Sequence, residues 1–148
     1  MSKAFQVGEV KLTYGRTEEY RGQLRSANCT IKFLRKLIDE SVIEHHEEFW
    51  VLFLNHAHKI IGFQQLSVGG LAGCVVDVRH LYQAALLTNA SKIIVCHNHP
   101  SGATTPSEPD IEITEKIKQC GKILDIQLLD HVILTSDSYM SFAEEGRL

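Results

Sequence analysis

Residues 49–55, "FWVLFLN", place an apolar side chain at almost every position instead of at every second one. A strand with one face in water alternates apolar and polar residues, whereas a strand that is apolar on both faces is covered on both sides. Residues 92–97, "KIIVCH", have the same character. Helical patterns lie between such strands, so the chain is predicted to be an α/β protein with a mixed sheet flanked by helices on both faces.

The remaining elements are predicted from periodicity and from helix-capping residues. Apolar residues spaced three and four apart predict three helices, each beginning at a residue that can cap it. The predicted helices are Thr30–His45, Asp77–Asn89 and Ser107–Leu124, and two further strands are predicted at 59–68 and 126–135. On the third helix the inward residues are expected to be Ile113, Ile117, Cys120 and Leu124.

The 148 residues are expected to form one domain, residues 29–148, after an N-terminal arm of residues 1–28 with a strand at Val7–Tyr14. The content of 44% hydrophobic and 22% charged residues is typical of a globular domain. The formal net charge of -3 does not favour strong nonspecific binding to nucleic acid. No apolar run is long enough for a signal peptide or a membrane span, and the four cysteines form no C-x-x-C pair. A cytoplasmic protein with reduced thiols and no membrane association is expected.

Residues 97–110, "HNHPSGATTPSEPD", combine two histidines with a carboxylate. His97 and His99 are two positions apart in an extended segment, so both imidazoles can point to the same face of the sheet. Asp110 follows after ten residues, in the first turn of the next predicted helix, where a carboxylate is favoured. Two imidazoles and one carboxylate suit zinc, and three protein ligands leave a fourth position for water, as in catalytic sites. The motif therefore predicts one Zn²⁺ ion per chain.

A zinc hydrolase also needs a group that moves the proton of water and a donor for the oxyanion. Ser107 lies three residues before Asp110 and could supply that donor. The same spacing fits a helix capping box, and both interpretations of Ser107 stay open. The proton shuttle is expected among the acidic residues before the first strand, which are Glu44, Glu47 and Glu48. His131 is interpreted as a hydrogen-bonded histidine of the sheet that could support the site from behind its ligands.

The pattern H-x-H, ten residues and D, with a serine three positions before the aspartate, resembles the JAMM signature of the JAB/MPN zinc metalloproteases. It is most similar to the RadC-like branch, whose loop has the sequence H-N-H-P-S-G and then P-S-x-x-D. The resemblance covers roughly residues 40–148, because the segments "EEFWVLFLN", "LLDHVIL" and "SFAEEGRL" also have counterparts there. It implies the cytidine-deaminase-like α/β fold of JAB/MPN domains.

The resemblance also implies a role for each residue of the motif. It makes His97, His99 and Asp110 the zinc ligands and Ser107 the oxyanion-stabilising serine. The family's catalytic glutamate precedes the first core strand, and that position corresponds to Glu47. Glu48 is the alternative, because the end of a strand is placed imprecisely from sequence and a shift of one residue reverses the face.

Three functional hypotheses follow from the motif and the resemblance. The leading one is a zinc-dependent peptidase or isopeptidase that acts on a peptide or protein substrate, because every required role has a candidate residue. The second is a DNA-associated RadC-like protein of repair or mobile-element biology, and the third is a non-catalytic JAB scaffold. RadC-like proteins usually carry an N-terminal helix-hairpin-helix segment that binds DNA, and the arm of residues 1–28 is expected to be too short for one. The acidic balance and the short arm disfavour the DNA hypothesis.

Overall fold

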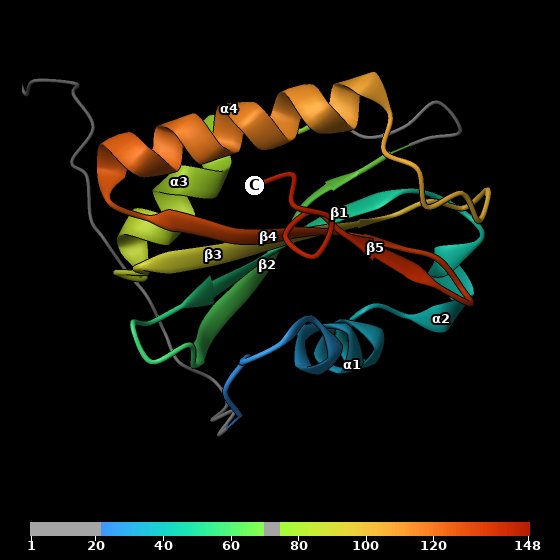
Figure 1. Ribbon diagram of the computed structural model, residues 1–148, viewed down its shortest axis with the longest axis horizontal. Coiled ribbons are helices and arrows are strands. Elements are labelled where there is room, and N and C mark those ends of the chain that lie inside the picture. Colours follow the sequence, from blue (N-terminus) through green and yellow to red (C-terminus); the bar gives the residue numbers. More distant parts are fainter. Residues whose placement is uncertain (1–21, 70–74) are drawn as a thin grey trace, which may run out of the picture.

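The computed structural model describes residues 22–69 and 75–148, which form one five-stranded sheet with helices on both faces (Figure 1). In chain order the elements are α1 (Ala27–Leu37), α2 (Glu40–Ile43), β1 (Glu48–Leu54), β2 (Ile60–Val68), α3 (Val78–Leu87), β3 (Lys92–Asn98), α4 (Glu108–Leu124), β4 (Gln127–Leu134) and β5 (Tyr139–Ser141). The predicted α/β class with a mixed sheet is confirmed. The strand predicted at Val7–Tyr14 lies outside the described residues.

The sheet has the strand order β2-β1-β3-β4-β5. β1 pairs antiparallel with both β2 and β3, β3 pairs parallel with β4, and β4 pairs antiparallel with β5. The parallel pair is joined through α4, because parallel neighbours need a crossover connection. Phe49 near the start of β1 is opposite His97 near the end of β3. The "HNHP" segment therefore lies at the same end of the sheet as the acidic residues before β1.

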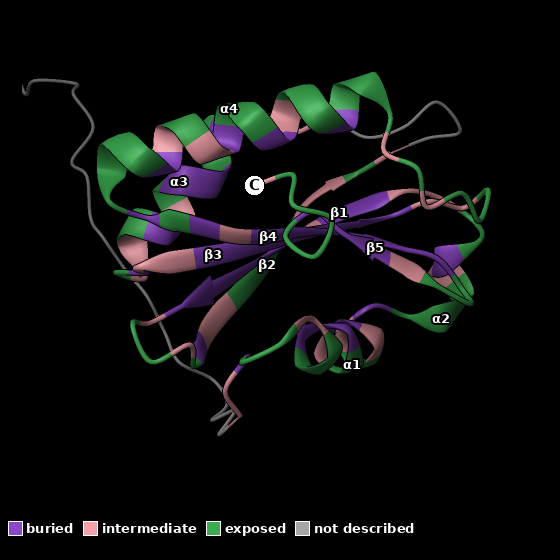
Figure 2. Ribbon diagram, in the orientation of Figure 1, coloured by how far each residue is buried: buried purple, intermediate pink, exposed green. Residues whose placement is uncertain are grey.

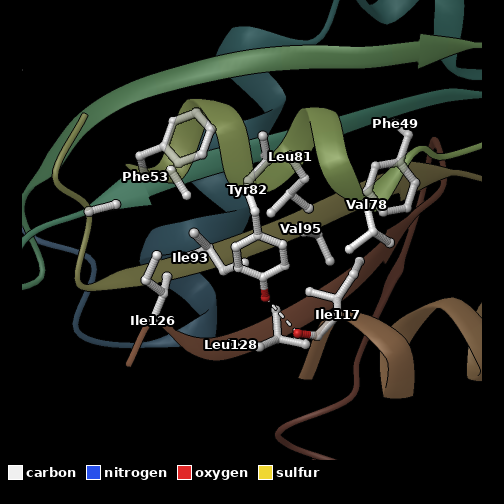
Figure 3. Close-up of a cluster of buried hydrophobic side chains, with 13 residues drawn as sticks. Phe49, Phe53, Val78, Leu81, Tyr82, Ile93, Val95, Ile117, Ile126 and Leu128 are labelled. Carbon is white, nitrogen blue, oxygen red and sulfur yellow. Dashed lines mark hydrogen bonds between the residues drawn. The ribbon is translucent and has the colours of Figure 1, made fainter. Parts of the chain in front are cut away.

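Alternate side chains of the central strands enter two separate cores, one on each face of the sheet. The central strands are mostly buried between the helices (Figure 2). Phe49, Val51 and Phe53 of β1 pack against α3 and α4 (Figure 3). Leu52 and Leu54 of the same strand pack on the opposite face, against α1 and its neighbours. These five residues are all buried, as expected for a strand covered on both sides.

β3 alternates in the same way and thereby determines which face each residue of the "HNH" segment occupies. Val95 belongs to the core beneath α3 and α4, and Cys96 belongs to the core on the α1 face. By the same alternation His97 faces α4, whereas Asn98 faces the chain segment between α2 and β1. Both residues are buried.

The first helix begins earlier than predicted. Its N-cap is Ser26, whose Oγ accepts a hydrogen bond of 3.3 Å from the backbone N–H of Cys29. Thr30, predicted to be the cap, lies inside the helix and is buried, and its hydroxyl donates to the carbonyl oxygen of Ser26 at 3.2 Å. The prediction of Thr30 as the helix start is therefore wrong, because a better-placed serine precedes it.

The helix predicted to continue to His45 is also divided in two. Ile38 has extended backbone angles and ends α1. Asp39 then accepts a hydrogen bond of 2.9 Å from the N–H of Ser41, which begins the separate short helix α2. A second capping residue within an apolar pattern of helical spacing therefore interrupts the helix.

The predicted inward face of α4 is confirmed for Ile117, which is buried, and in part for Ile113 and Cys120, which pack partly buried against the same core. The buried residues of α4 are Asp110, Thr114, Ile117 and Gly121. Leu124, predicted to face inward, is 39% exposed. A side chain at Gly121 would overlap the carbonyl oxygen of Ile126, and the hydroxyl of Tyr82 donates to the carbonyl oxygen of Ile117 at 2.6 Å. This close contact of α4 with α3 and the start of β4 determines the orientation of the helix.

Candidate metal centre

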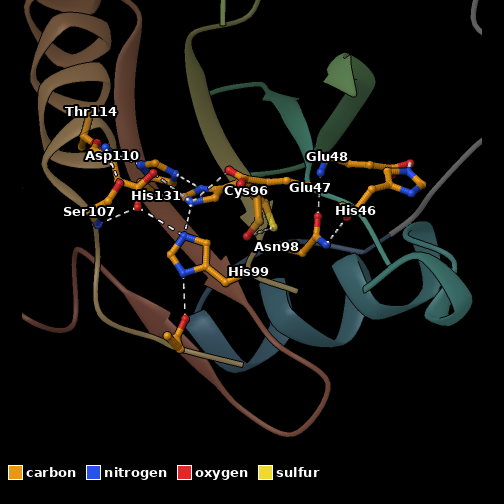
Figure 4. Close-up of polar contacts among 12 residues, drawn as sticks. His46, Glu47, Glu48, Cys96, Asn98, His99, Ser107, Asp110, Thr114 and His131 are labelled. Carbon is orange, nitrogen blue, oxygen red and sulfur yellow. Dashed lines mark hydrogen bonds and ion pairs between the residues drawn. The ribbon is translucent and has the colours of Figure 1, made fainter. Parts of the chain in front are cut away.

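Four side chains with potential metal ligands converge at the end of the sheet where β1 begins and β3 ends (Figure 4). They are Glu47, His97, His99 and Asp110, and one ligand atom of each lies within 4.8 Å of the others. His97 is buried at the base of the cluster, while Glu47 and His99 are partly exposed. β3 supplies His97, the loop after it supplies His99, α4 supplies the aspartate, and the segment before β1 supplies the glutamate.

The distances among His97, His99 and Asp110 suit a tetrahedral metal ion. The two Nε2 atoms are 2.9 Å apart, Asp110 Oδ1 is 3.1 Å from His97 Nε2, and Asp110 Oδ2 is 3.2 Å from His99 Nε2. Ligand atoms around a tetrahedral zinc ion, with bonds of about 2.0–2.1 Å, are separated by about 3.3 Å. Glu47 Oε1 is farther out, 4.0 Å from His97 Nε2. The donor set of two imidazoles and one carboxylate therefore fits zinc, with Glu47 beside it.

The charge of Asp110 supports a site for a cation. Burial acts to raise the pKa of this carboxyl, but the adjacent side chains of His97 and His99 and the backbone N–H of Ser107 outweigh burial and hold its pKa far below the usual range. The neighbouring carboxylate of Asp110 raises the pKa of His99. At neutral pH the cluster therefore presents an ionised carboxylate to the two imidazoles.

The start of α4 positions Asp110 through a capping box with Ser107. Ser107 Oγ accepts the backbone N–H of Asp110 at 3.2 Å, and Asp110 Oδ2 accepts the backbone N–H of Ser107 at 2.7 Å. The capping interpretation of Ser107 is confirmed. Because Oγ is the acceptor in this bond, its own hydrogen can still be donated to a substrate oxygen, and the predicted oxyanion role stays a prediction.

The loop after β3 orients His99. The carbonyl oxygen of Ala103 lies 2.7 Å from His99 Nδ1 and can only accept, so Nδ1 carries the hydrogen and Nε2 presents its lone pair to the cluster. The backbone N–H of His99 donates to Leu134 of β4 at 3.0 Å, which attaches the loop to the sheet. Gly102 has φ of 81°, a left-handed conformation that glycine adopts without strain, and it completes the tight turn.

A second buried imidazole lies behind His97. His131 Nε2 is 2.7 Å from His97 Nδ1, and His131 Nδ1 is 2.6 Å from the hydroxyl of Thr114. Its ring stacks on Phe142 with centroids 4.8 Å apart. Burial lowers the pKa of His131 well below its ordinary value, so the imidazole is neutral. The predicted hydrogen-bonded sheet histidine is confirmed, and it contacts a candidate ligand directly.

The two neighbouring glutamates point in different directions (Figure 4). The carboxylate of Glu48 is buried, lies 3.0 Å from His46 Nε2, and accepts a hydrogen bond of 3.0 Å from Trp50 Nε1. Of the two glutamates, only Glu47 belongs to the cluster of potential metal ligands found among the described residues. The geometry thus favours Glu47 over Glu48 as the acidic group beside the metal ligands.

Two residues that bear on the site, Asn98 and Thr114, were not singled out from the sequence. The side-chain amide of Asn98 donates to the carbonyl oxygens of Ile43 and His46, at 2.9 and 2.7 Å. Its Oδ1 accepts the backbone N–H of Glu48 at 2.8 Å. The sequence contained one indication of the role of Asn98: it is a polar residue between two histidines and lies on the strand face opposite to theirs.

Together, the mixed sheet and the cluster at its end define an α/β domain with a candidate metal site. The family model described as the RadC-like JAB domain matches residues 24–147. The chain therefore belongs to the RadC-like JAB family, and the resemblance found in the motif is confirmed. No helix in the described ranges combines the length and apolar character needed to cross a membrane.

Relatives of the chain occur in distant bacteria. A UPF0758 protein of Flavobacterium johnsoniae is 54% identical over 101 residues, which are 68% of this chain and 44% of that relative. The UPF0758 protein SH1266 of Staphylococcus haemolyticus is 36% identical over 146 residues, 99% of this chain and 62% of that relative. The chain thus spans less than two thirds of either relative. Their names state no activity, so membership identifies the fold and the family of the site, and the reaction is inferred from the geometry.

Proposed function

We propose that this domain is a zinc-dependent amide hydrolase of peptidase or isopeptidase type that acts on a peptide or protein substrate. The observation that carries the proposal is the set of contacts of 2.9, 3.1 and 3.2 Å that joins His97, His99 and Asp110, with Glu47 beside them. Two imidazoles and one carboxylate form a donor set typical of catalytic zinc, whereas calcium and magnesium prefer oxygen ligands alone. His97, His99 and Asp110 would hold one ion per chain.

A zinc ion held by these three residues would activate a water molecule for attack and polarise a neighbouring carbonyl group. The carboxylate of Glu47, 4.0 Å from His97 Nε2, takes a proton from the attacking water and delivers it to the leaving amine. The hydroxyl of Ser107 donates a hydrogen bond to the oxyanion of the tetrahedral intermediate. The residues proposed for these roles lie next to the start of β1, the end of β3 and the start of α4.

The first test is elemental analysis of the purified protein beside a His97→Ala, His99→Ala double variant. About one zinc ion per wild-type chain is expected, in line with a three-ligand site, and the double variant should have lost it. A wild-type protein that binds no zinc, even after treatment with a chelator and addition of zinc, would refute the metal site.

The second test separates Glu47 from its neighbour. Glu47→Gln should retain zinc and lose roughly 10²–10⁴-fold in turnover, the usual contribution of a general acid–base group. Glu48→Gln is the matched control and should keep both properties, because its carboxylate contacts His46 and Trp50 instead of the cluster. Hydrolysis is followed by mass spectrometry on a peptide library and on isopeptide-linked proteins. Undiminished hydrolysis by Glu47→Gln would exclude Glu47 as the general base.

A further inference from the structure

The hydrogen bonds behind His97 have a defined direction that begins at a backbone carbonyl group. Thr114 Oγ1 lies 2.5 Å from the carbonyl oxygen of Asp110 and 2.6 Å from His131 Nδ1. A carbonyl oxygen has no hydrogen, so the single hydroxyl hydrogen of Thr114 lies in the contact with Asp110. Thr114 Oγ1 is therefore the acceptor in its contact with His131, and His131 Nδ1 carries a hydrogen.

The next link transfers this direction to His97. His131 is completely buried and stacks on Phe142, so its imidazole is neutral and has one donor and one acceptor nitrogen. Since Nδ1 of His131 carries the hydrogen, its Nε2 accepts, and the contact of 2.7 Å with His97 Nδ1 takes its hydrogen from His97. His97 then has its hydrogen on Nδ1, and the lone pair of its Nε2 faces the other two candidate ligands.

We infer that Thr114 and His131 are positioning residues that hold His97 in the tautomer required for metal binding. The inference rests on the proposed metal site and adds the reason why His97 presents a lone pair to it. The chain of hydrogen bonds starts at the carbonyl oxygen of Asp110 and ends at His97 Nδ1, while Nε2 of the same ring lies 3.1 Å from the carboxylate of Asp110. α4, β4 and β3 each supply a member.

This chain of hydrogen bonds couples two candidate ligands that come from different elements. Asp110 is attached to α4 and His97 to β3, and the contact between Thr114 and His131 joins α4 to the neighbouring strand β4. A hydroxyl at position 114 is needed for this coupling, because it has to donate to one group and accept from another at the same time. Valine has the branched shape of threonine but can do neither.

The test compares Thr114→Val with Thr114→Ser in metal-free protein. Nitrogen-15 NMR of the histidine rings distinguishes nitrogens that carry a hydrogen from those that do not. The wild type and Thr114→Ser should have the hydrogen on Nδ1 of both His97 and His131. In Thr114→Val the Nδ1–H of His131 loses its acceptor, so the reversed tautomer becomes populated and the hydrogen of His97 appears on Nε2. A wild-type His97 with its hydrogen on Nε2, or unchanged tautomers in Thr114→Val, would overturn the inference.

Zinc affinity is the second measurement, made by competition with a chromogenic chelator. Thr114→Val should bind zinc about 10–100-fold more weakly, the usual effect of removing a partner of a metal-binding histidine, and Thr114→Ser should bind as the wild type does. Equal affinity in all three proteins would overturn the requirement for this tautomer. If the wild type bound no zinc, the proposed function would fail, while the NMR measurement on metal-free protein would still decide the hydrogen-bond direction.

Discussion

The side chain of Asn98 accepts a hydrogen bond of 2.8 Å from the backbone N–H of Glu48, across the pair of strands β1 and β3. The same side chain donates to the carbonyl oxygens of Ile43 and His46. The residue between the two candidate histidine ligands therefore attaches the chain segment that carries Glu47 to the end of β3. This amide is one of the contacts that position the proposed general base relative to the candidate metal ligands, beside the hydrogen bond from the backbone N–H of Gly69 to the carbonyl oxygen of Glu47.

Replacing Asn98 with leucine should separate stability and turnover from metal binding. The variant removes the partners of one buried N–H and two carbonyl groups, and the free energy of unfolding should fall by about 2–4 kcal/mol. Zinc content should change little, because His97 and His99 point to the opposite face of β3, while hydrolysis should fall with the loosened Glu47. Urea denaturation, elemental analysis and the peptide assay measure the three effects. An Asn98→Leu protein as stable as the wild type would contradict the role given to the amide.

Removing zinc should destabilise the folded protein. The three ligands come from β3, the loop after it and the start of α4, so the unfolded chain does not hold them together. At a free zinc concentration of 100 times the Kd, the stabilisation is about 2.7 kcal/mol. Each kcal/mol shifts the Tm of a domain of this size by about 2–4 °C, so zinc should raise the Tm by roughly 5–10 °C relative to chelator. The His97→Ala, His99→Ala variant should show no shift, and an equal shift there would place the ion elsewhere.

Gly121→Ala should destabilise the protein although alanine is the better helix former. The added Cβ would overlap the carbonyl oxygen of Ile126 and contact the hydroxyl of Tyr82, so α4 would have to move away from the sheet. A loss of about 1–3 kcal/mol in the free energy of unfolding is expected from such overpacking. Lys116→Ala, on the exposed face of the same helix, is the control and should cause no comparable loss. A more stable Gly121→Ala protein would disprove the close approach.

The cysteines should react with alkylating reagents according to their burial. Cys29 is exposed, and a hydrogen bond with Ser26 lowers its thiol pKa, so it should be modified rapidly in the native protein. Cys96 is buried in the core between α1 and the sheet, and burial raises the pKa of its thiol. Its modification should be slower by ~10³-fold or more, because it requires unfolding. Mass spectrometry of peptides from a timed reaction measures both rates, and similar rates would contradict a sheet covered on this face.

Much of the fold was predictable because its strands and caps leave local traces. The two apolar faces of β1 indicated a sheet covered on both sides, and Asp77 and Ser107 cap α3 and α4 as predicted. The break between α1 and α2 was missed because apolar residues continue at helical spacing across Asp39. The exposure of Leu124 and the close approach of α4 at Gly121 were missed, because the contact of Gly121 with Ile126 is not contained in the periodicity.

The candidate site was predictable to the extent that its members are close in the sequence. The H-x-H pair and Asp110 share one strand–loop–helix segment, and the structure brings them together as the motif predicted. The choice between Glu47 and Glu48 depended on the residue at which β1 begins, and it required the contacts of Glu48 with its neighbours. The sequence contained one local sign for Thr114, its position one helical turn after Asp110. Its contact with His131 could not be predicted, because His131 comes from another element, β4.

The capping box at the start of α4 has a practical consequence for studies of the substrate. Asp110 accepts the backbone N–H of Ser107 at 2.7 Å and also faces His97, so a substitution there removes half of the capping box together with a candidate metal ligand. An Asp110 variant that loses activity would therefore confound chemistry with folding. The carboxylate of Glu47 lies outside the capping box, and its substitution leaves all three candidate ligands in place. A Glu47→Gln protein is thus the appropriate bait for trapping an uncleaved substrate from cells.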